Sequence, residues 1–179
     1  MKALIINDLQ NDFHPAGLAP VPGSDALPDR INALQKDFDL IIGVRFWMPV
    51  DHVVFAGNHL WRKPGQSIRF EKLDIELKEM FCVADSFGAE WMMGLDTSRM
   101  RQVLDKGTDP LVPPYSAFRD IRNRPLGLSD LLRASGVSEV VLAGVNFEDS
   151  LRHTLEDAKE EGFKAVLIPD AVAGLSESE

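Results

Sequence analysis

Short apolar runs alternate along the chain with segments in which apolar residues recur at helical spacing. Five runs have the length and the Val, Ile and Leu content of strands, and they cover residues 3–8, 40–44, 103–106, 140–143 and 165–168. Runs that are apolar at consecutive positions are typical of strands covered on both faces, as in a parallel sheet. The pattern therefore predicts five buried strands.

Three segments between these runs have the spacing of an amphipathic helix. They cover residues 27–34, 126–134 and 147–161. Ser24 or Asp25 is the candidate cap at the start of the first helix. Strands that alternate with helices predict an α/β fold with a three-layer, doubly wound and mostly parallel sheet, and residues 1–179 are expected to form a single domain.

The stretch from about residue 47 to residue 86 follows neither pattern. It contains prolines, glycines and scattered aromatic residues, and its apolar positions have only weak periodicity. Long segments of this kind in a compact domain are commonly functional loops. We therefore expect a long loop region next to an active site or an interface.

The charge balance limits the classes of partner. The 179 residues include 19 Lys and Arg against 28 Asp and Glu, a net charge of −9, which disfavours binding to nucleic acid or to an anionic membrane. Cys82 is the only cysteine, so no internal disulfide can form, and this fits a reducing compartment. We expect a cytoplasmic protein whose partner is a small molecule.

Polar residues follow three of the predicted strands. Asp8 ends the first run, Lys106 ends the third, and the segment from Asn146 to Ser150 follows the fourth. Ligands of doubly wound sheets bind beyond the carboxyl ends of the strands. We therefore expect Asp8, Lys106 and Ser150 to lie together at that edge.

Five motifs occur in an order that is similar to that of a known family. They read D-L-Q-N-D-F at residues 8–13, F-W-M-P-V-D-H-V-V-F at 46–55, G-A-E at 88–90, K-G-T-D-P at 106–110 and Y-S-A-F at 115–118. They resemble the isochorismatase-like hydrolase superfamily and, within it, most closely the nicotinamidases. The resemblance covers residues 2 to about 174 and implies the same fold.

The resemblance also implies a catalytic site. In this family an Asp–Lys–Cys triad hydrolyses a C–N bond through a thioester. Asp8 and Lys106 match the first two members, and Ser150 occupies the position of the cysteine. The oxyanion hole would be formed by the backbone N–H groups of Asn146 and Ser150, the former after a cis peptide bond between Val145 and Asn146.

Substrate contacts are implied at four further positions, which are Phe13, Trp47, Tyr115 and Asn146. Phe13 matches an aromatic residue that stacks on the substrate ring.

The resemblance also implies where a divalent metal would bind in nicotinamidases, and the matching positions here carry the apolar residues Phe46, Met48 and Phe81. Three such replacements together predict that the site is filled by a hydrophobic cluster, because a carboxylate left there without its ion would be costly. We expect no metal and no other cofactor. The alternative is a rebuilt metal site made of Asp51, His52 and His59.

Three functions stay open from the sequence. The first is a metal-free hydrolase that uses Asp8 and Lys106 on a small amide or vinyl ether other than nicotinamide. Isochorismatases cleave a vinyl ether in this way, and Asp8 would then be the general acid. The second is an inactive pseudoenzyme that binds a small aromatic or amide ligand or serves as an oligomeric scaffold, with Ser150 only filling space. The third is a serine amidase that uses Asp8, Lys106 and Ser150.

Two further expectations concern packing. Cys82 matches a non-catalytic cysteine of the family, and buried packing is the better interpretation of it. The family commonly forms oligomers, so we expect a homo-oligomer, with the apolar region 46–93 as its interface.

Overall fold

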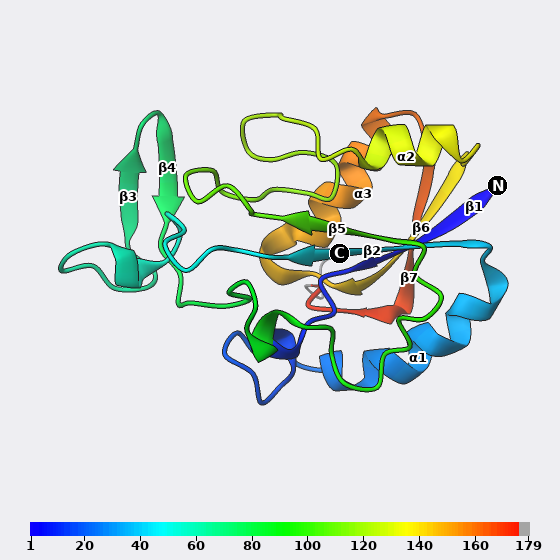
Figure 1. Ribbon diagram of the computed structural model, residues 1–179, viewed down its shortest axis with the longest axis horizontal. Helices are drawn as coiled ribbons and strands as arrows, with labels where there is room; N and C mark the ends of the chain where they lie inside the picture. Colours follow the sequence, from blue (N-terminus) through cyan, green and yellow to red (C-terminus); the bar gives the residue numbers. More distant parts are fainter. Residues whose placement is uncertain (176–179) are drawn as a thin grey trace.

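Five parallel strands form the central sheet in the computed structural model, which describes residues 1–175. Their order across the sheet is β5-β2-β1-β6-β7 (Figure 1). The bounds are Lys2–Asn7 for β1, Leu40–Phe46 for β2, Gln102–Lys106 for β5, Glu139–Val145 for β6 and Lys164–Ala173 for β7. All five predicted strands are present, and the predicted fold class is confirmed.

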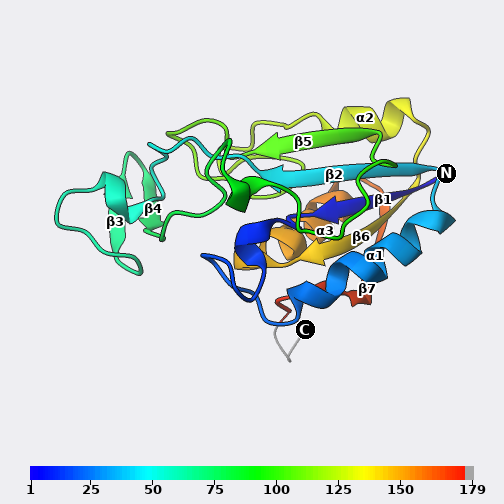
Figure 2. The ribbon, with the colours of Figure 1, turned by 60° about the horizontal axis from the view of Figure 1, so that its bottom comes forward.

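Successive residues of β1 pack on opposite faces of the sheet, as the period of a strand requires. Leu4 and Ile6 of β1 pack in one hydrophobic cluster with residues of α1 (Leu27–Leu34). Ala3 and Ile5 pack in a second cluster with residues of α2 (Leu128–Ala134) and α3 (Ser150–Glu160). Figures 1 and 2 show the sheet between these helices, which makes three layers.

The strand order reverses between β1 and β6. From β1 the chain moves outward in one direction to β2 and β5, and it then returns to β6 on the other side of β1 and continues to β7. In a doubly wound sheet this reversal opens a crevice beyond the carboxyl ends of the two strands. Asp8 directly follows β1, and the turn before α3 directly follows β6.

The expectation of an irregular loop region over residues 47–86 was wrong in part. The antiparallel hairpin of β3 (Ser67–Phe70) and β4 (Leu73–Glu76) lies inside it, and Figure 1 shows the hairpin at one end of the molecule, beyond the carboxyl ends of β2 and β5. Four-residue strands are too short to give a clear alternation of apolar and polar residues.

The predicted side-chain cap of α1 was also wrong. Ala26 occupies the cap position, and no side chain bonds there. The Ser24 hydroxyl instead donates to the Phe13 carbonyl oxygen at 2.7 Å. Ser24 therefore joins the loop before the helix to the segment after β1. Among residues 1–175, no helix is long and apolar enough to cross a membrane.

Candidate active site

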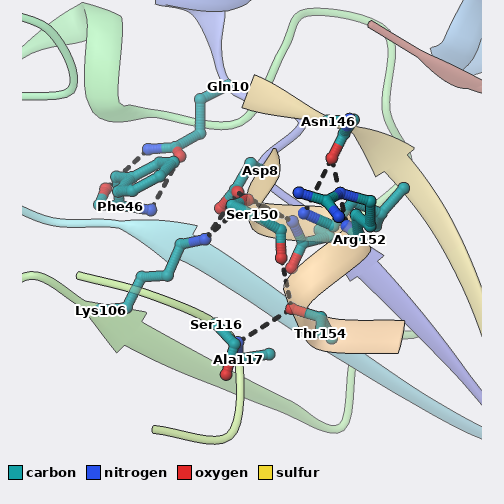
Figure 3. A network of polar contacts seen from close by, with 12 residues as sticks. Asp8, Gln10, Phe46, Lys106, Ser116, Ala117, Asn146, Ser150, Arg152 and Thr154 are labelled. Carbon is teal, nitrogen blue, oxygen red and sulfur yellow. Dashed lines mark hydrogen bonds and ion pairs between the residues drawn. The ribbon is translucent and has the colours of Figure 1, made fainter. Parts of the chain in front are cut away.

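Asp8, Lys106 and Ser150 meet at the carboxyl ends of the strands, although they are far apart in the sequence (Figure 3). The Lys106 Nζ lies 2.7 Å from the Asp8 Oδ2. The Ser150 hydroxyl donates to the same oxygen at 2.5 Å, and it accepts a hydrogen bond from the Lys106 Nζ at 3.1 Å. One carboxylate oxygen thus binds both an ammonium group and a hydroxyl.

Sharp turns place two of these residues. Asp8 has a left-handed backbone with φ of 56°, and its N–H donates to the Val44 carbonyl oxygen at 2.8 Å. Before Ser150, both Glu148 and Asp149 have positive φ, and this turn brings Ser150 to the first position of α3. Positive φ in residues other than glycine is uncommon and clusters at functional sites.

The three side chains are almost closed to solvent. Asp8 is 0%, Lys106 1% and Ser150 4% exposed. Burial raises the pKa of the Asp8 carboxyl, and the charge of Lys106 opposes this rise. Burial lowers the pKa of the Lys106 ammonium, and Asp8 opposes this fall. Both directions bring the two groups closer to sharing a proton, as an acid–base pair must.

A cavity of about 370 Å³ opens beside this trio. Of the three residues only Ser150 lines it. The apolar part of the wall includes Phe46, Phe81, Phe147, Pro113, Pro114 and, from the hairpin, Leu73 and Ile75. Four charged residues, Asp74, Glu76, Lys78 and Glu148, also line the cavity. Of the three residues, Ser150 is therefore the one that a ligand in this cavity would contact, while Asp8 and Lys106 are bonded to its hydroxyl.

Of the four predicted substrate contacts, Tyr115 lines this cavity, and the other three lie outside its lining. Phe13 is fully buried and packs with its ring centroid 4.7 Å from that of Phe147. The Arg45 guanidinium stacks on the Trp47 ring at 3.8 Å. The Asn146 Oδ1 accepts hydrogen bonds from the first turn of α3.

The expected oxyanion hole is not formed. The peptide bond between Val145 and Asn146 is trans, and the Asn146 N–H donates to the Ala173 carbonyl oxygen of β7 at 2.8 Å. The Ser150 N–H donates to the Phe147 carbonyl oxygen. Both donors that the family resemblance implied are therefore engaged inside the protein, and the expectation of a cis bond was wrong.

The residues at the metal positions do not fit an ion. Phe46, Met48 and Phe81 are at most 4% exposed and belong to one hydrophobic cluster. The rings of Phe46 and Phe81 meet edge to face at 5.4 Å, and none of the three side chains offers a strong ligand for Zn²⁺ or Fe²⁺.

The alternative metal site is not assembled. A ring nitrogen of His59 bonds with the Val53 carbonyl oxygen at 2.7 Å, and His52 is fully buried. In the part of the chain that the structure describes, no group of three or more His, Cys, Asp or Glu residues could hold a metal ion.

Sequence reasoning missed three residues of the site. Phe147 and His153 line the cavity with Ser150, and the His153 ring stacks on that of Tyr115 at 4.1 Å. Burial lowers the pKa of His153. Asn7 bonds to both Asp8 and Ser150. Its amide at the end of an apolar strand was the one signal in the sequence that pointed to a special role.

Cys82 lies in the core, where burial raises the pKa of its thiol. It is 0% exposed, and its backbone N–H donates to the Asp12 Oδ2 at 2.6 Å. A thiol in such surroundings is inert, because the reactive species is the thiolate.

The fold and the site together define a class of α/β protein with a buried carboxylate, amine and hydroxyl at the switch point of a parallel sheet. The chain matches the family model for the isochorismatase domain over residues 2–179. It therefore belongs to the isochorismatase family, within the isochorismatase-like cysteine hydrolase superfamily, and its relatives are nicotinamidases.

Among these relatives, the nicotinamidase of Acinetobacter baylyi is 32% identical over 170 residues, which is 94% of this chain and 79% of the relative. The nicotinamidase/pyrazinamidase of Mycobacterium tuberculosis is 31% identical over 179 residues, 98% of this chain and 88% of the relative. The solved nicotinamidase of Acinetobacter baumanii superposes with a TM-score of 0.91 at 28% identity, over 98% of this chain and 85% of that structure.

Proposed function

We propose that this protein is a metal-independent hydrolase of small apolar amides, with Ser150 as its nucleophile. One observation carries the proposal: Ser150 lines the cavity, and its hydroxyl donates to the Asp8 Oδ2 at 2.5 Å, beside the Lys106 Nζ. A nucleophile bonded to its base in this way is the arrangement that covalent hydrolysis requires.

The steps follow from these contacts. The Ser150 Oγ attacks the substrate carbonyl carbon while its proton passes to Asp8, and the positive charge of Lys106 stabilises the oxygen that loses the proton. The C–N bond then breaks, the amine leaves with the proton from Asp8, and an ester joins the acyl group to Ser150. Water hydrolyses this ester by the same proton transfers in reverse.

Amide hydrolysis is better supported than acid cleavage of a vinyl ether. The second reaction would leave the Ser150 hydroxyl without a part, although this hydroxyl is bonded to Asp8 and belongs to the one residue of the three that lines the cavity. The aromatic walls favour an apolar acyl group, such as that of benzamide, over the more polar ring of nicotinamide, the substrate named for the relatives.

A second candidate is a binding protein without turnover. The expected oxyanion donors are not free, and this favours the second candidate. The backbone N–H groups of Asn146 and Ser150 both donate to carbonyl oxygens of the protein. Loss of a single oxyanion donor costs about 10²–10³ in rate, so a hydrolase with this resting geometry is expected to be slow.

The test is ammonia release from benzamide and from nicotinamide, together with calorimetric binding of both. We expect benzamide to be the better substrate and Ser150→Ala to lower its turnover by at least about 10³-fold. Ser138→Ala, which changes an exposed serine, is the matched control and should leave the rate unchanged. Equal turnover by Ser150→Ala would refute Ser150 as nucleophile. Binding without any turnover would favour the second candidate.

The proposal extends to the state of the protein in the cell. We propose a homo-oligomer, supported by Leu18, Phe87 and Met93, which are exposed around a hollow of about 630 Å³, because exposed apolar patches commonly mark interfaces. A Phe87→Arg/Met93→Glu variant should sediment as a monomer, and a wild-type protein that already sediments as a monomer would contradict this.

The unpaired thiol of Cys82 supports a cytoplasmic location, which cell fractionation tests.

A further inference from the structure

Asn7 places a polar side chain where the sequence is otherwise apolar. It is the last residue of β1, it follows the fully buried run from Ala3 to Ile6, and it is 0% exposed. Burying an amide costs free energy unless hydrogen bonds replace those it made with water. The partners of these hydrogen bonds therefore indicate the role of Asn7.

Both bonds of the Asn7 amide nitrogen go to the reacting groups of the proposed hydrolase. The Nδ2 donates to the Asp8 Oδ2 at 2.8 Å and to the Ser150 Oγ at 3.1 Å. These are the two atoms between which the proton of Ser150 would move. Asn7 thus bonds to the donor and to the acceptor of the same proton.

The Ser150 Oγ has its full set of hydrogen bonds as a result. It donates once, to Asp8, and it accepts twice, from the Lys106 Nζ and the Asn7 Nδ2. A hydroxyl has one donor and two acceptor positions, so this arrangement fixes the oxygen and directs its proton at Asp8. One of the two accepted bonds has to open when the oxygen attacks a carbonyl carbon. Sulfur is only a weak acceptor, and a thiol at this position would gain little from the two N–H groups.

The carbonyl end of the Asn7 side chain lowers the stability of the fold. Its Oδ1 is buried, and it has no hydrogen-bond partner among the described residues. A buried acceptor without a partner lowers stability. An apolar residue of similar size would avoid this cost, so packing alone does not explain an asparagine here.

We propose that Asn7 is a positioning residue that adapts this site to an oxygen nucleophile. It holds the Ser150 Oγ against Asp8, and its N–H meets the negative charge that grows on that oxygen as the proton leaves. This inference rests on the proposed function, because it assigns Asn7 a part in the reaction of Ser150.

The test is a double-mutant cycle of Asn7→Leu and Ser150→Cys, measured as kcat and KM for benzamide. In the wild-type background we expect Asn7→Leu to lower kcat by about 10- to 100-fold and to leave KM nearly unchanged, since Asn7 does not line the cavity. In the Ser150→Cys background the same change should lower kcat by less than about 3-fold. Equal losses in both backgrounds, or no loss in either, would overturn the proposal.

Stability separates positioning from packing. Asn7→Leu removes the unpaired Oδ1 together with the two hydrogen bonds of the Nδ2. Because these effects on stability oppose each other, its urea midpoint should stay close to that of the wild-type protein while kcat falls. A fall in both together would show that the residue acts through packing.

A second readout works without amide turnover. An aryl fluorophosphonate labels an activated serine: the Ser150 Oγ bonds to phosphorus, fluoride leaves, and the hydroxyl proton passes to Asp8. We expect mass spectrometry to find the label on Ser150 and Asn7→Leu to slow labelling by about 10-fold or more. Labelling that depends on Asn7 without benzamide turnover would refute the proposed function alone. Turnover or labelling that is independent of Asn7 would refute this inference alone, and a wild-type protein that shows neither would refute both.

Discussion

Replacing Asp8 with asparagine is expected to lower the free energy of unfolding by about 3–5 kcal/mol, because Lys106 would keep a buried charge without its counter-ion. The ammonium lies 2.7 Å from the Asp8 carboxylate and is 1% exposed, so water cannot replace the lost partner. Urea unfolding at neutral pH measures the change.

The matched control is the exposed pair of Arg69 and Asp74, whose N–O distance is 2.6 Å and whose side chains are 61% and 73% exposed. Asp74→Asn should cost less than about 1 kcal/mol. An Asp8→Leu/Lys106→Met variant removes both charges and should recover the stability, or exceed it. An equal effect of Asp8→Asn and Asp74→Asn would contradict the assignment of a buried ion pair.

The pH dependence of the same pair has a definite sign. The raised pKa of Asp8 adds stability below its unfolded value of about 3.8, and this is lost as the pH rises through the folded value. The lowered pKa of Lys106 adds stability above its unfolded value of about 10.5, and this is lost as the pH falls through the folded value. The Leu/Met double variant should therefore gain most over the wild type between these limits.

The second large effect is expected from Phe81→Ala, which should cost about 3–5 kcal/mol. The Phe81 ring is 4% exposed, and its centroid lies 5.4 Å from that of Phe46 and 4.8 Å from that of Phe147. Its removal would leave a cavity next to the active site, and the stability should fall together with the affinity for benzamide.

Trp61→Ala provides the control for this experiment. Trp61 is 90% exposed, so its removal should change the stability by less than about 0.5 kcal/mol. If Phe81→Ala cost no more than Trp61→Ala, the cluster that occupies the metal positions would not contribute to the stability of the fold.

The strands and the convergence of Asp8, Lys106 and Ser150 could be predicted because they follow from local rules. Consecutive apolar residues indicate buried strands, and polar residues at strand ends meet at one edge of a parallel sheet. The motifs at residues 8–13 and 106–110 supported the same fold class, because members of one family share a fold.

What could not be predicted depends on three-dimensional neighbours. The hairpin was missed because each of its strands has only four residues. Phe147 and His153 were missed because the turn before α3 decides which side chains face the cavity. The hydrogen bond from the Asn146 N–H to the Ala173 carbonyl oxygen depends on the position of β7. Because β7 is distant in the sequence, no local pattern could predict this bond.

The burial of Cys82 has a consequence for chemical resistance. Peroxides and alkylating agents inactivate thiol hydrolases by reacting with an exposed thiolate. Here Cys82 is the only cysteine, and its thiol is buried in the core with a raised pKa. Such agents therefore find no reactive thiolate on the surface of this protein.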